Sequence, residues 1–204
     1  MVIVIAQQAR SPAQDRALAS MFRARKQVFV DLLKWDVPVV DGRFEVDSYD
    51  NEHPTYLIVA NSRGEHLGSA RLLETTGPHI LADLYPELCA GPVPRGPRTL
   101  EITRFCLGRN QRAPQRRVTR NRLVSALVSL ALEQGFELYT GVAEVGWLQQ
   151  ILAFGWDSWP LGQPREIGGR LLGALAISIT ARTPALLAQT GIWAGPPPSI
   201  AKAA

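Results

Sequence analysis

The stretch TYLIVANSRGEHLGSARLL, residues 55–73, decides the fold of this chain. It contains two apolar runs, 55–60 and 66–73, on either side of the turn-forming segment Asn61-Ser62-Arg63-Gly64. Short apolar runs bounded by a polar, glycine-containing connection favour two strands that pair with each other. The sequence therefore predicts a β-hairpin at this point of the chain.

Helical and extended patterns alternate on both sides of the hairpin. Before it, MVIVIAQQAR indicates a first strand, and the three- and four-residue spacing of apolar residues between Ser11 and Leu33 indicates one amphipathic helix or two short ones. After it, the patterns predict a short helix, a strand, a helix, a strand, a helix, a strand and a short helix, at 81–84, 99–107, 115–134, 137–142, 145–154, 170–179 and 184–188. This order predicts the α/β class, as a mixed-sheet sandwich with flanking helices.

The length of the chain and its apolar segments limit its organisation. A chain of 204 residues is long enough for one sizeable core, so we expect a single domain over 1–204, with a frayed tail over 193–204. The longest late apolar run, 171–179, is about half of a membrane span, and the N-terminus lacks the basic start of a signal peptide. The short apolar runs indicate no membrane partner. Two cysteines in no paired motif favour a reduced, cytoplasmic protein.

The basic residues are concentrated in one part of the chain. The net charge is +4, and residues 95–122 carry nine arginines against one acid, Glu101. A basic face of this kind is usually solvated, and no helix-turn-helix or aromatic-interleaved pattern accompanies it. We therefore expect no nucleic acid as a partner, while an anionic substrate suits the excess charge.

An acidic stretch follows Gly42. Glu45, Asp47, Asp50 and Glu52 place four carboxylates within eight residues, without the spacing of a calcium-binding loop. The stretch is either a solvated loop or a pocket for a cationic ligand. The three histidines show no metal-ligand spacing, so we expect no metal. No P-loop or G-x-G-x-x-G motif occurs, so we also expect no cofactor.

Two further positions carry charge on predicted strands. Arg71 lies among apolar neighbours, where a charge needs a partner or a ligand. Glu101 and Arg104, in EITRF, are three residues apart and lie on opposite faces of an ideal strand. They share a site if the strand bends between them.

The motifs taken in order resemble those of one family. RARKQVFVDLLKWDVP, FEVDSYDNEHPTYLIV, GSARLLETTGPHIL and LEITRF, within residues 23–105, are similar to the acyl-homoserine-lactone (autoinducer) synthases. The family pattern is an arginine, a phenylalanine and a tryptophan, then E-x-D-x-Y/F-D, G-S-x-R-L-x-x-T-T-G-P and E-x-S/T-R-F. The matching positions are Arg25, Phe29, Trp35, Glu45, Asp47, Asp50, Arg71, Glu101 and Arg104. After residue 110 the similarity is weaker.

The resemblance implies an acetyltransferase-like (GNAT-like) fold and a two-step reaction. The amine of S-adenosyl-L-methionine attacks an acyl thioester, and the methionine carboxylate then closes a lactone and expels methylthioadenosine. Asp47 and Asp50 would hold the cationic substrate, and Arg25, Arg71 or Arg104 its carboxylate. Glu101 or Glu45 would be the general base. The resemblance also implies that Phe29 and Trp35 bind substrate.

The resemblance also bears on the acyl donor, which is acyl-CoA or an acyl-acyl carrier protein. Phe105, Ala143 and Trp147 are the expected acyl-pocket residues. Ala143 stands where family members that prefer a 3-oxo chain often have threonine, so we expect another chain to be preferred. Residues 142–162 contain no lysine or arginine to receive an acidic carrier protein, which favours acyl-CoA.

Two other functions remain open at this point. A generic acyl-CoA N-acetyltransferase would share the fold without needing S-adenosylmethionine. A non-enzymatic regulator would instead use the basic helix at 109–122 to contact nucleic acid, in a salt-dependent manner.

Overall fold

The computed structural model describes residues 1–5 and 11–197. These residues form two compact units. The first unit comprises 1–72, 104–126 and 195–197, and the second comprises 73–103 and 127–194. Strands β5 (His66–Glu74) and β6 (Thr99–Leu107) and helix α3 (Ala113–Gln134) run from one unit into the other.

The first unit is an antiparallel set of strands with a helix packed on it. Its other elements are β1 (Val2–Ile5), α1 (Pro12–Arg25), the π-helix η1 (Lys26–Leu32), β2 (Val39–Val40), β3 (Phe44–Glu45) and β4 (Thr55–Ala60). The strand order is β1-β4-β5-β6. Strand β4 pairs with β5 from Thr55↔Leu72, and this register places Tyr56 opposite Arg71.

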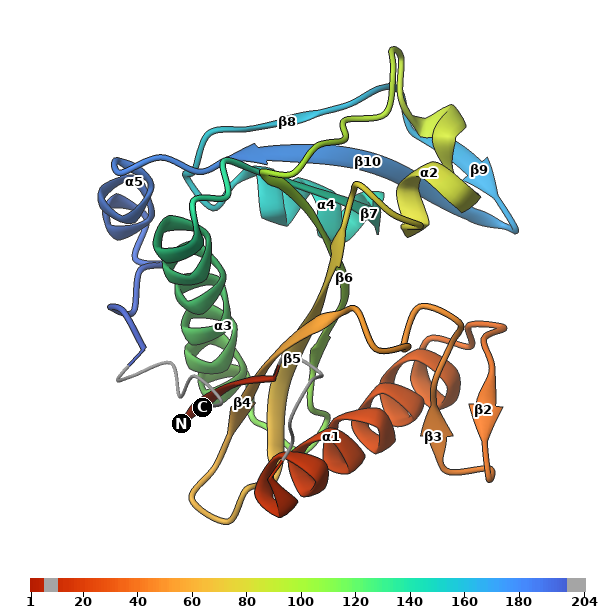
Figure 1. The fold of residues 1–204 in the computed structure, drawn as a ribbon, viewed down its shortest axis with the longest axis vertical. Helices are drawn as coiled ribbons and strands as arrows, with labels where there is room; N and C mark the ends of the chain where they lie inside the picture. Colours follow the sequence, from red (N-terminus) through yellow and green to blue (C-terminus); the bar gives the residue numbers. More distant parts are fainter. Residues whose placement is uncertain (6–10, 198–204) are drawn as a thin grey trace. The chain divides into compact units, whose positions relative to one another are not determined.

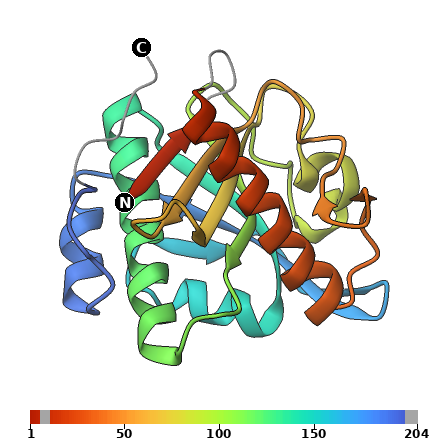
Figure 2. The ribbon, with the colours of Figure 1, turned by 90° about the horizontal axis from the view of Figure 1, so that it is seen from below.

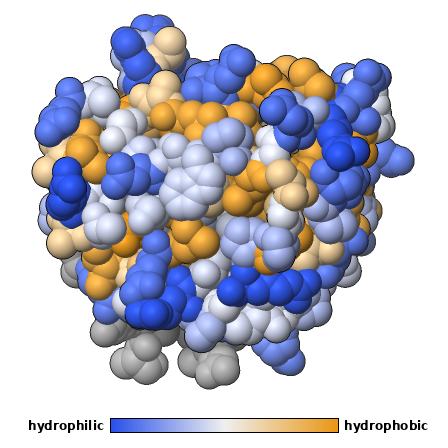
Figure 3. Space-filling view, turned by 90° about the horizontal axis from the view of Figure 1, so that it is seen from above, coloured by the Kyte–Doolittle hydropathy of each residue, from blue (hydrophilic) through white to orange (hydrophobic). Residues whose placement is uncertain are grey.

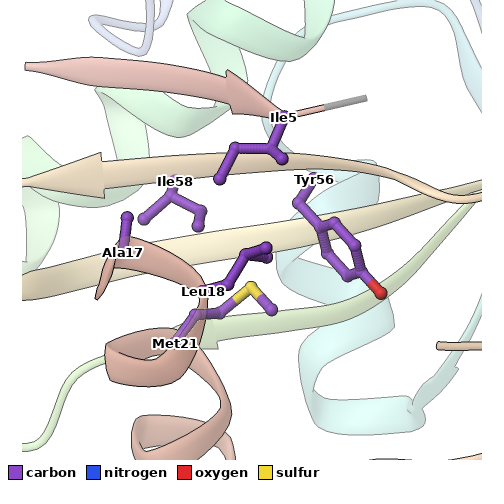
Figure 4. Close-up of a cluster of buried hydrophobic side chains, with 6 residues drawn as sticks. All are labelled: Ile5, Ala17, Leu18, Met21, Tyr56 and Ile58. Atoms are coloured by element: carbon purple, nitrogen blue, oxygen red, sulfur yellow. The ribbon is translucent and has the colours of Figure 1, made fainter. Parts of the chain in front are cut away.

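Helix α1 is specified by its first turn and by its apolar face. Ser11 and Gln14 form a capping box, and Pro12 occupies the first helical position, where its missing N–H costs nothing. Leu18 and Met21 pack against Tyr56 and Ile58 of β4, as Figure 4 shows. Figures 1 and 2 show the helix lying across β4 and β5. This packing brings the C-terminal end of α1 to the candidate site.

The second unit contains a parallel strand pair and a long antiparallel strand. Its elements are α2 (Ile80–Leu84), the 3₁₀-helix η2 (Pro86–Leu88), β7 (Leu138–Glu144), α4 (Val145–Leu152), β8 (Ser158–Pro160), β9 (Arg165–Ile167), β10 (Arg170–Ser178) and α5 (Thr183–Gln189). Strand β6 pairs in parallel with β7 over three residue pairs that end at Glu101↔Thr140. Strand β10 pairs antiparallel with β7, β8 and β9. The sheet is therefore mixed, and the predicted α/β fold is confirmed.

The parallel pairing ends early within the second unit. Both β6 and β7 continue beyond the pair Glu101↔Thr140. The resemblance to acetyltransferase-like folds implies a central sheet that splays apart. The register thus agrees with the fold that the resemblance implied.

Most predicted elements are present, with shifts of a few residues at their ends. No regular element was predicted between Leu33 and Thr55, but a small hairpin occurs there, in which Val39 and Val40 pair with Glu45 and Phe44. The Asp41-Gly42 turn explains it, because both residues have positive φ (51° and 62°) and the Arg43 N–H donates to the Val40 carbonyl. Strands β8 and β9 were also not predicted.

Three expectations about the ends and the organisation of the chain remain. The tail predicted to fray over 193–204 begins with Trp193, whose N–H donates to the Leu187 carbonyl, while 198–204 lie outside the described residues. The single domain over 1–204 stays a prediction. No helix among the described residues is long and apolar enough to cross a membrane. On the face drawn in Figure 3, polar residues separate groups of hydrophobic residues.

Candidate active site

Six charged side chains of the first unit form a closed ring of ion pairs. Each arginine contacts two carboxylates, and each carboxylate contacts two arginines. Around the ring the order is Arg25, Glu45, Arg104, Asp47, Arg71, Asp50 and again Arg25. The sequence predicted all six as site residues, and the structure brings them together.

The ion pairs are short and well oriented. Arg25 Nε lies 2.5 Å from Glu45 Oε2, and its two terminal nitrogens each lie 2.8 Å from one oxygen of Asp50. Arg104 reaches Glu45 Oε1 at 3.0 Å and Asp47 Oδ2 at 2.7 Å. Paired guanidinium–carboxylate contacts of this kind are among the strongest hydrogen bonds in proteins.

Arg71 closes the ring between the two aspartates. Its Nη1 lies 2.6 Å from Asp47 Oδ1 and 2.8 Å from Asp50 Oδ1. Its Nη2 lies 3.1 Å from Asp47 Oδ2. The buried charge predicted at Arg71 therefore has partners within the protein.

Asp50 is saturated with donors. Its two oxygens receive both terminal nitrogens of Arg25, Nη1 of Arg71, the hydroxyl of Tyr56 and the backbone N–H of Asp47, all within 2.9 Å. Its side chain is fully buried. Asp50 consequently has little capacity left for a ligand.

The ring differs in accessibility from one side to the other. The side chains of Asp47 and Arg104 are 10% and 11% exposed, whereas those of the other four members are at most 1% exposed. Three positive and three negative charges balance, which a buried cluster requires. The accessible edge of the ring is therefore the Asp47–Arg104 pair.

Burial and pairing act in opposite directions on the ionisation of the ring. Burial by itself lowers the pKa of Arg25, but the hydrogen bonds and charges of Asp50 and Glu45 outweigh it and raise that pKa above its ordinary value. Burial by itself raises the pKa of Asp50, yet Arg25 and Arg71 lower it well below its usual range. Both groups therefore stay charged at neutral pH.

Two aromatic side chains border the accessible edge. Phe29, on η1, stacks on Trp35 with ring centroids 4.6 Å apart and planes 18° from parallel. The Arg104 guanidinium lies over both rings, at 5.7 Å and 5.8 Å from their centroids. The predicted substrate-binding residues Phe29 and Trp35 are thus adjacent to the ring.

The backbone of β6 is irregular at Arg104. This residue has a φ of 50°, a left-handed conformation that is uncommon for a non-glycine residue. A strand that passes through such a residue loses the strict alternation of side-chain directions. The regular alternation of an ideal strand is therefore interrupted at Arg104, and a site shared by Glu101 and Arg104 stays a prediction.

Glu101 lies three residues earlier on β6, in the second unit, and is fully buried. Its Oε1 accepts the backbone N–H of Leu81 at 2.9 Å. Leu81 is the second residue of α2, whose preceding residue, His79, makes no capping bond with its side chain. Glu101 therefore caps α2 from a neighbouring strand, a role that the sequence did not indicate.

Comparison with known families agrees with this constellation. Residues 10–180 match the family described as autoinducer synthase. The chain belongs to this family.

Individual autoinducer synthases are similar over nearly the whole chain. An acyl-homoserine-lactone synthase of Ralstonia nicotianae is 34% identical over 195 residues, covering 92% of this chain and 93% of the relative. The structure of BjaI, a CoA-dependent acyl-homoserine lactone synthase with SAM and isopentyl-CoA, is 29% identical. It has a TM-score of 0.83 and covers 98% of this chain and 91% of that chain. The family resemblance is confirmed.

The fold alone extends to a wider group. A putative N-acetyltransferase from Lactobacillus plantarum is 17% identical, with a TM-score of 0.60, over 88% of this chain and 98% of that chain. This likeness confirms the acetyltransferase-like architecture of the chain.

The three residues predicted to form the acyl pocket occur in different units. Phe105 lies on β6 in the first unit, whereas Ala143 on β7 and Trp147 on α4 lie in the second. Trp147 makes an edge contact with Phe154 at 5.8 Å, and Phe154 lies 5.7 Å from Trp156. These contacts give Trp147 and Trp156 a packing role, and the common acyl pocket stays a prediction.

One residue that contacts the ring was not identified from the sequence. Tyr56 donates to Asp50 but occurs in an apolar run that is typical of a buried strand.

No group of three histidine, cysteine, aspartate or glutamate side chains suited to a metal ion occurs in the part of the chain that the structure describes. The carboxylates at 45–50 are engaged by arginines instead. Three carboxylates of the acidic stretch, those of Glu45, Asp47 and Asp50, therefore form the acidic half of the ring, whereas the side chain of Glu52 is exposed.

Proposed function

We propose that this chain synthesises an N-acyl-L-homoserine lactone from S-adenosyl-L-methionine and an acyl thioester, releasing methylthioadenosine. Membership in the autoinducer synthase family supports the reaction. We assign substrate binding to particular residues on one observation, which is that the Asp47–Arg104 pair is the accessible edge of an otherwise buried ring. We place the reaction in the cytoplasm, where both substrates are made.

The α-amino acid end of the substrate is complementary to this edge. It carries an ammonium and a carboxylate on the same carbon, while Asp47 and Arg104 present the opposite charges side by side. Insertion between them pairs the carboxylate with Arg104 and the ammonium with Asp47. One ion pair is replaced by two, and the alternation of charge around the ring is preserved.

A second feature of the site, its aromatic border, suits the sulfonium cation of S-adenosylmethionine. The stacked faces of Phe29 and Trp35 lie beside Arg104, and aromatic faces attract cations within about 6 Å. When the substrate carboxylate draws Arg104 toward itself, the faces of the Phe29 and Trp35 rings become available to the sulfonium. Phe29 and Trp35 thus remain our proposed substrate-binding residues.

The reaction needs a base and positioning. We propose Glu101 as the general base that takes a proton from the ammonium, because its Oε1 is already held by Leu81 and its orientation is fixed. The freed amine attacks the thioester carbonyl and the thiol leaves. The methionine carboxylate then attacks its own γ-carbon, which closes the lactone and expels methylthioadenosine. Glu45, held by Arg25 and Arg104, is better suited to orient Arg104 than to accept a proton.

We propose acyl-CoA as the donor. Residues 102–132 contain seven arginines and no acid, and the phosphates of CoA are suited to such a segment. Helix α4 and its surroundings, 142–162, contain no basic residue for an acidic carrier protein. The relative BjaI, described as CoA-dependent, supports the same choice.

The purified chain, mixed with S-adenosylmethionine and a series of acyl-CoAs, tests the reaction. We expect stoichiometric methylthioadenosine and an acyl-homoserine lactone identified by mass spectrometry. Acylated product without methylthioadenosine would instead identify a generic N-acetyltransferase. Initial rates with matched acyl-CoA and acyl-carrier protein then test the donor, and a large preference for the carrier protein would contradict our choice.

A further inference from the structure

We propose that Tyr56 is a positioning residue for the reaction, which fixes Asp50 and thereby the Asp47 carboxylate that receives the substrate ammonium. The inference rests on the proposed function. Tyr56 lies in an apolar strand, and its hydroxyl contacts Asp50, a buried member of the ring. Its effect is transmitted through hydrogen bonds.

The first step is the contact between Tyr56 and Asp50. The Tyr56 hydroxyl donates to Asp50 Oδ1 at 2.8 Å. The register of β4 and β5 places Tyr56 opposite Arg71, and Arg71 Nη1 lies 2.8 Å from the same oxygen. One strand pair therefore presents a neutral and a charged donor to a single carboxylate oxygen.

The second step is the rigidity of Tyr56 itself. Its ring is fully buried and packs with Leu18, Met21 and Ile58 in the core cluster between α1 and β4 (Figure 4). Phe22 contacts it edge-on, with ring centroids 6.0 Å apart. Burial, followed by the charge of Asp50, raises the pKa of Tyr56, so the hydroxyl remains a donor. The hydrophobic core thus sets the position of a polar atom in the ring.

The third step leads from Asp50 to the accessible edge. The other oxygen of Asp50 accepts the backbone N–H of Asp47 at 2.9 Å. The Asp47 side chain also shares Arg71 with Asp50. Rotation of the Asp50 carboxylate would therefore move both the backbone and the guanidinium that orient Asp47.

A test must separate this role from ordinary core packing. Tyr56→Phe deletes one oxygen, and Asp50 Oδ1 keeps two arginine donors, so we expect the variant to fold. The matched control is Ile58→Val, which removes a methyl group from the same cluster and the same face of β4 without contact to the ring. Both variants are assayed for steady-state kinetics with both substrates and for S-adenosylmethionine affinity by calorimetry.

We expect Tyr56→Phe to raise the KM and the dissociation constant for S-adenosylmethionine about tenfold, the effect of one hydrogen bond to a charged group. Its KM for acyl-CoA should remain within about twofold of wild type, as should both constants in Ile58→Val. Equal effects of the two variants, or no effect of Tyr56→Phe on S-adenosylmethionine, would overturn the inference. A wild-type chain that binds no S-adenosylmethionine would instead overturn the proposed function.

Discussion

Arg104 Nη2 lies 2.7 Å from Asp47 Oδ2, and these two residues are the members of the ring that retain solvent exposure. Every other link joins at least one side chain that is at most 1% exposed. Breaking the Asp47–Arg104 ion pair therefore costs less free energy than breaking any other pair in the ring. Water can solvate these two charges once they separate, whereas the buried charges would be left unpaired in a medium that solvates charge poorly. The position of substrate entry follows from this difference.

Asp47→Asn removes the charge proposed to receive the ammonium. We expect kcat/KM for S-adenosylmethionine to fall about tenfold to hundredfold, since a hydrogen bond to a charged group is worth roughly 1.5–3 kcal/mol. Steady-state kinetics measures the effect. Glu52→Gln is the matched control, because this neighbouring acid has a side chain that is 84% exposed. Equal kinetics for the two variants would remove Asp47 from the substrate site.

Glu101→Gln distinguishes the proposed role of Glu101 as general base from its role as a cap of α2. A glutamine oxygen still accepts the Leu81 N–H, so we expect unchanged thermal stability together with a rate reduced about 10²–10⁴-fold. Glu101→Ala loses both roles and should also be destabilised by about 1–3 kcal/mol. Calorimetry and initial rates distinguish the pair. A glutamine variant as fast as wild type would leave Glu101 as a cap alone.

Arg25→Lys tests whether Arg25 supports the ring rather than the substrate. A single ammonium cannot maintain the Nε contact with Glu45 and the two contacts with Asp50. We expect a loss of about 3–5 kcal/mol in the free energy of unfolding, measured in urea, because buried carboxylates lose their partners. Arg23→Lys, on the exposed side of the same helix, should change it by less than about 0.5 kcal/mol. Similar midpoints for the two variants would argue against a structural role.

His66 provides a pH dependence of stability unrelated to the ring. Burial lowers the pKa of His66 from 6.5 to about 4, so the folded state binds the proton less readily than the unfolded state. Stability from the neutral imidazole is present above pH 6.5 and is lost as the pH falls toward 4. The loss is on the order of 3 kcal/mol.

Unfolding curves recorded between pH 7 and pH 4 measure this dependence. His66→Gln lacks the titrating group but keeps a hydrogen-bonding side chain for Ser69, which lies 2.9 Å from His66 Nε2. The variant should therefore lose less stability than wild type over this range. His53→Gln, at a side chain that is 75% exposed, should behave as wild type. Parallel curves for His66→Gln and wild type would refute the assignment.

The regular elements were predictable because their patterns are local. The strand at 99–107 was predicted with its observed bounds, and the hairpin of β4 and β5 ends within one residue of its prediction. The β2–β3 hairpin was missed because its strands have two residues each and Val39 and Val40 are exposed. The Asp41-Gly42 pair was nevertheless a turn signal that could have found it.

The candidate site was predictable in composition but not in connectivity. The charged residues were identified through the family motifs, whereas their pairing depends on a hairpin, a helix end and two strands that are distant in sequence. Asp47 and Asp50 were both assigned to the substrate, because nothing in DSYD distinguishes an accessible carboxylate from a saturated one. Tyr56 had no signal, since a tyrosine in TYLIVA is what a buried strand normally contains.

The closed ring also constrains how this protein can vary. Each of its six charged side chains pairs with two side chains of opposite charge. A single replacement therefore leaves two charged side chains without one of their partners, and a second replacement can compensate for only one of these losses. Drift through stepwise neutral changes is therefore blocked at these positions. Descendants of this chain should keep the whole set or abandon it together.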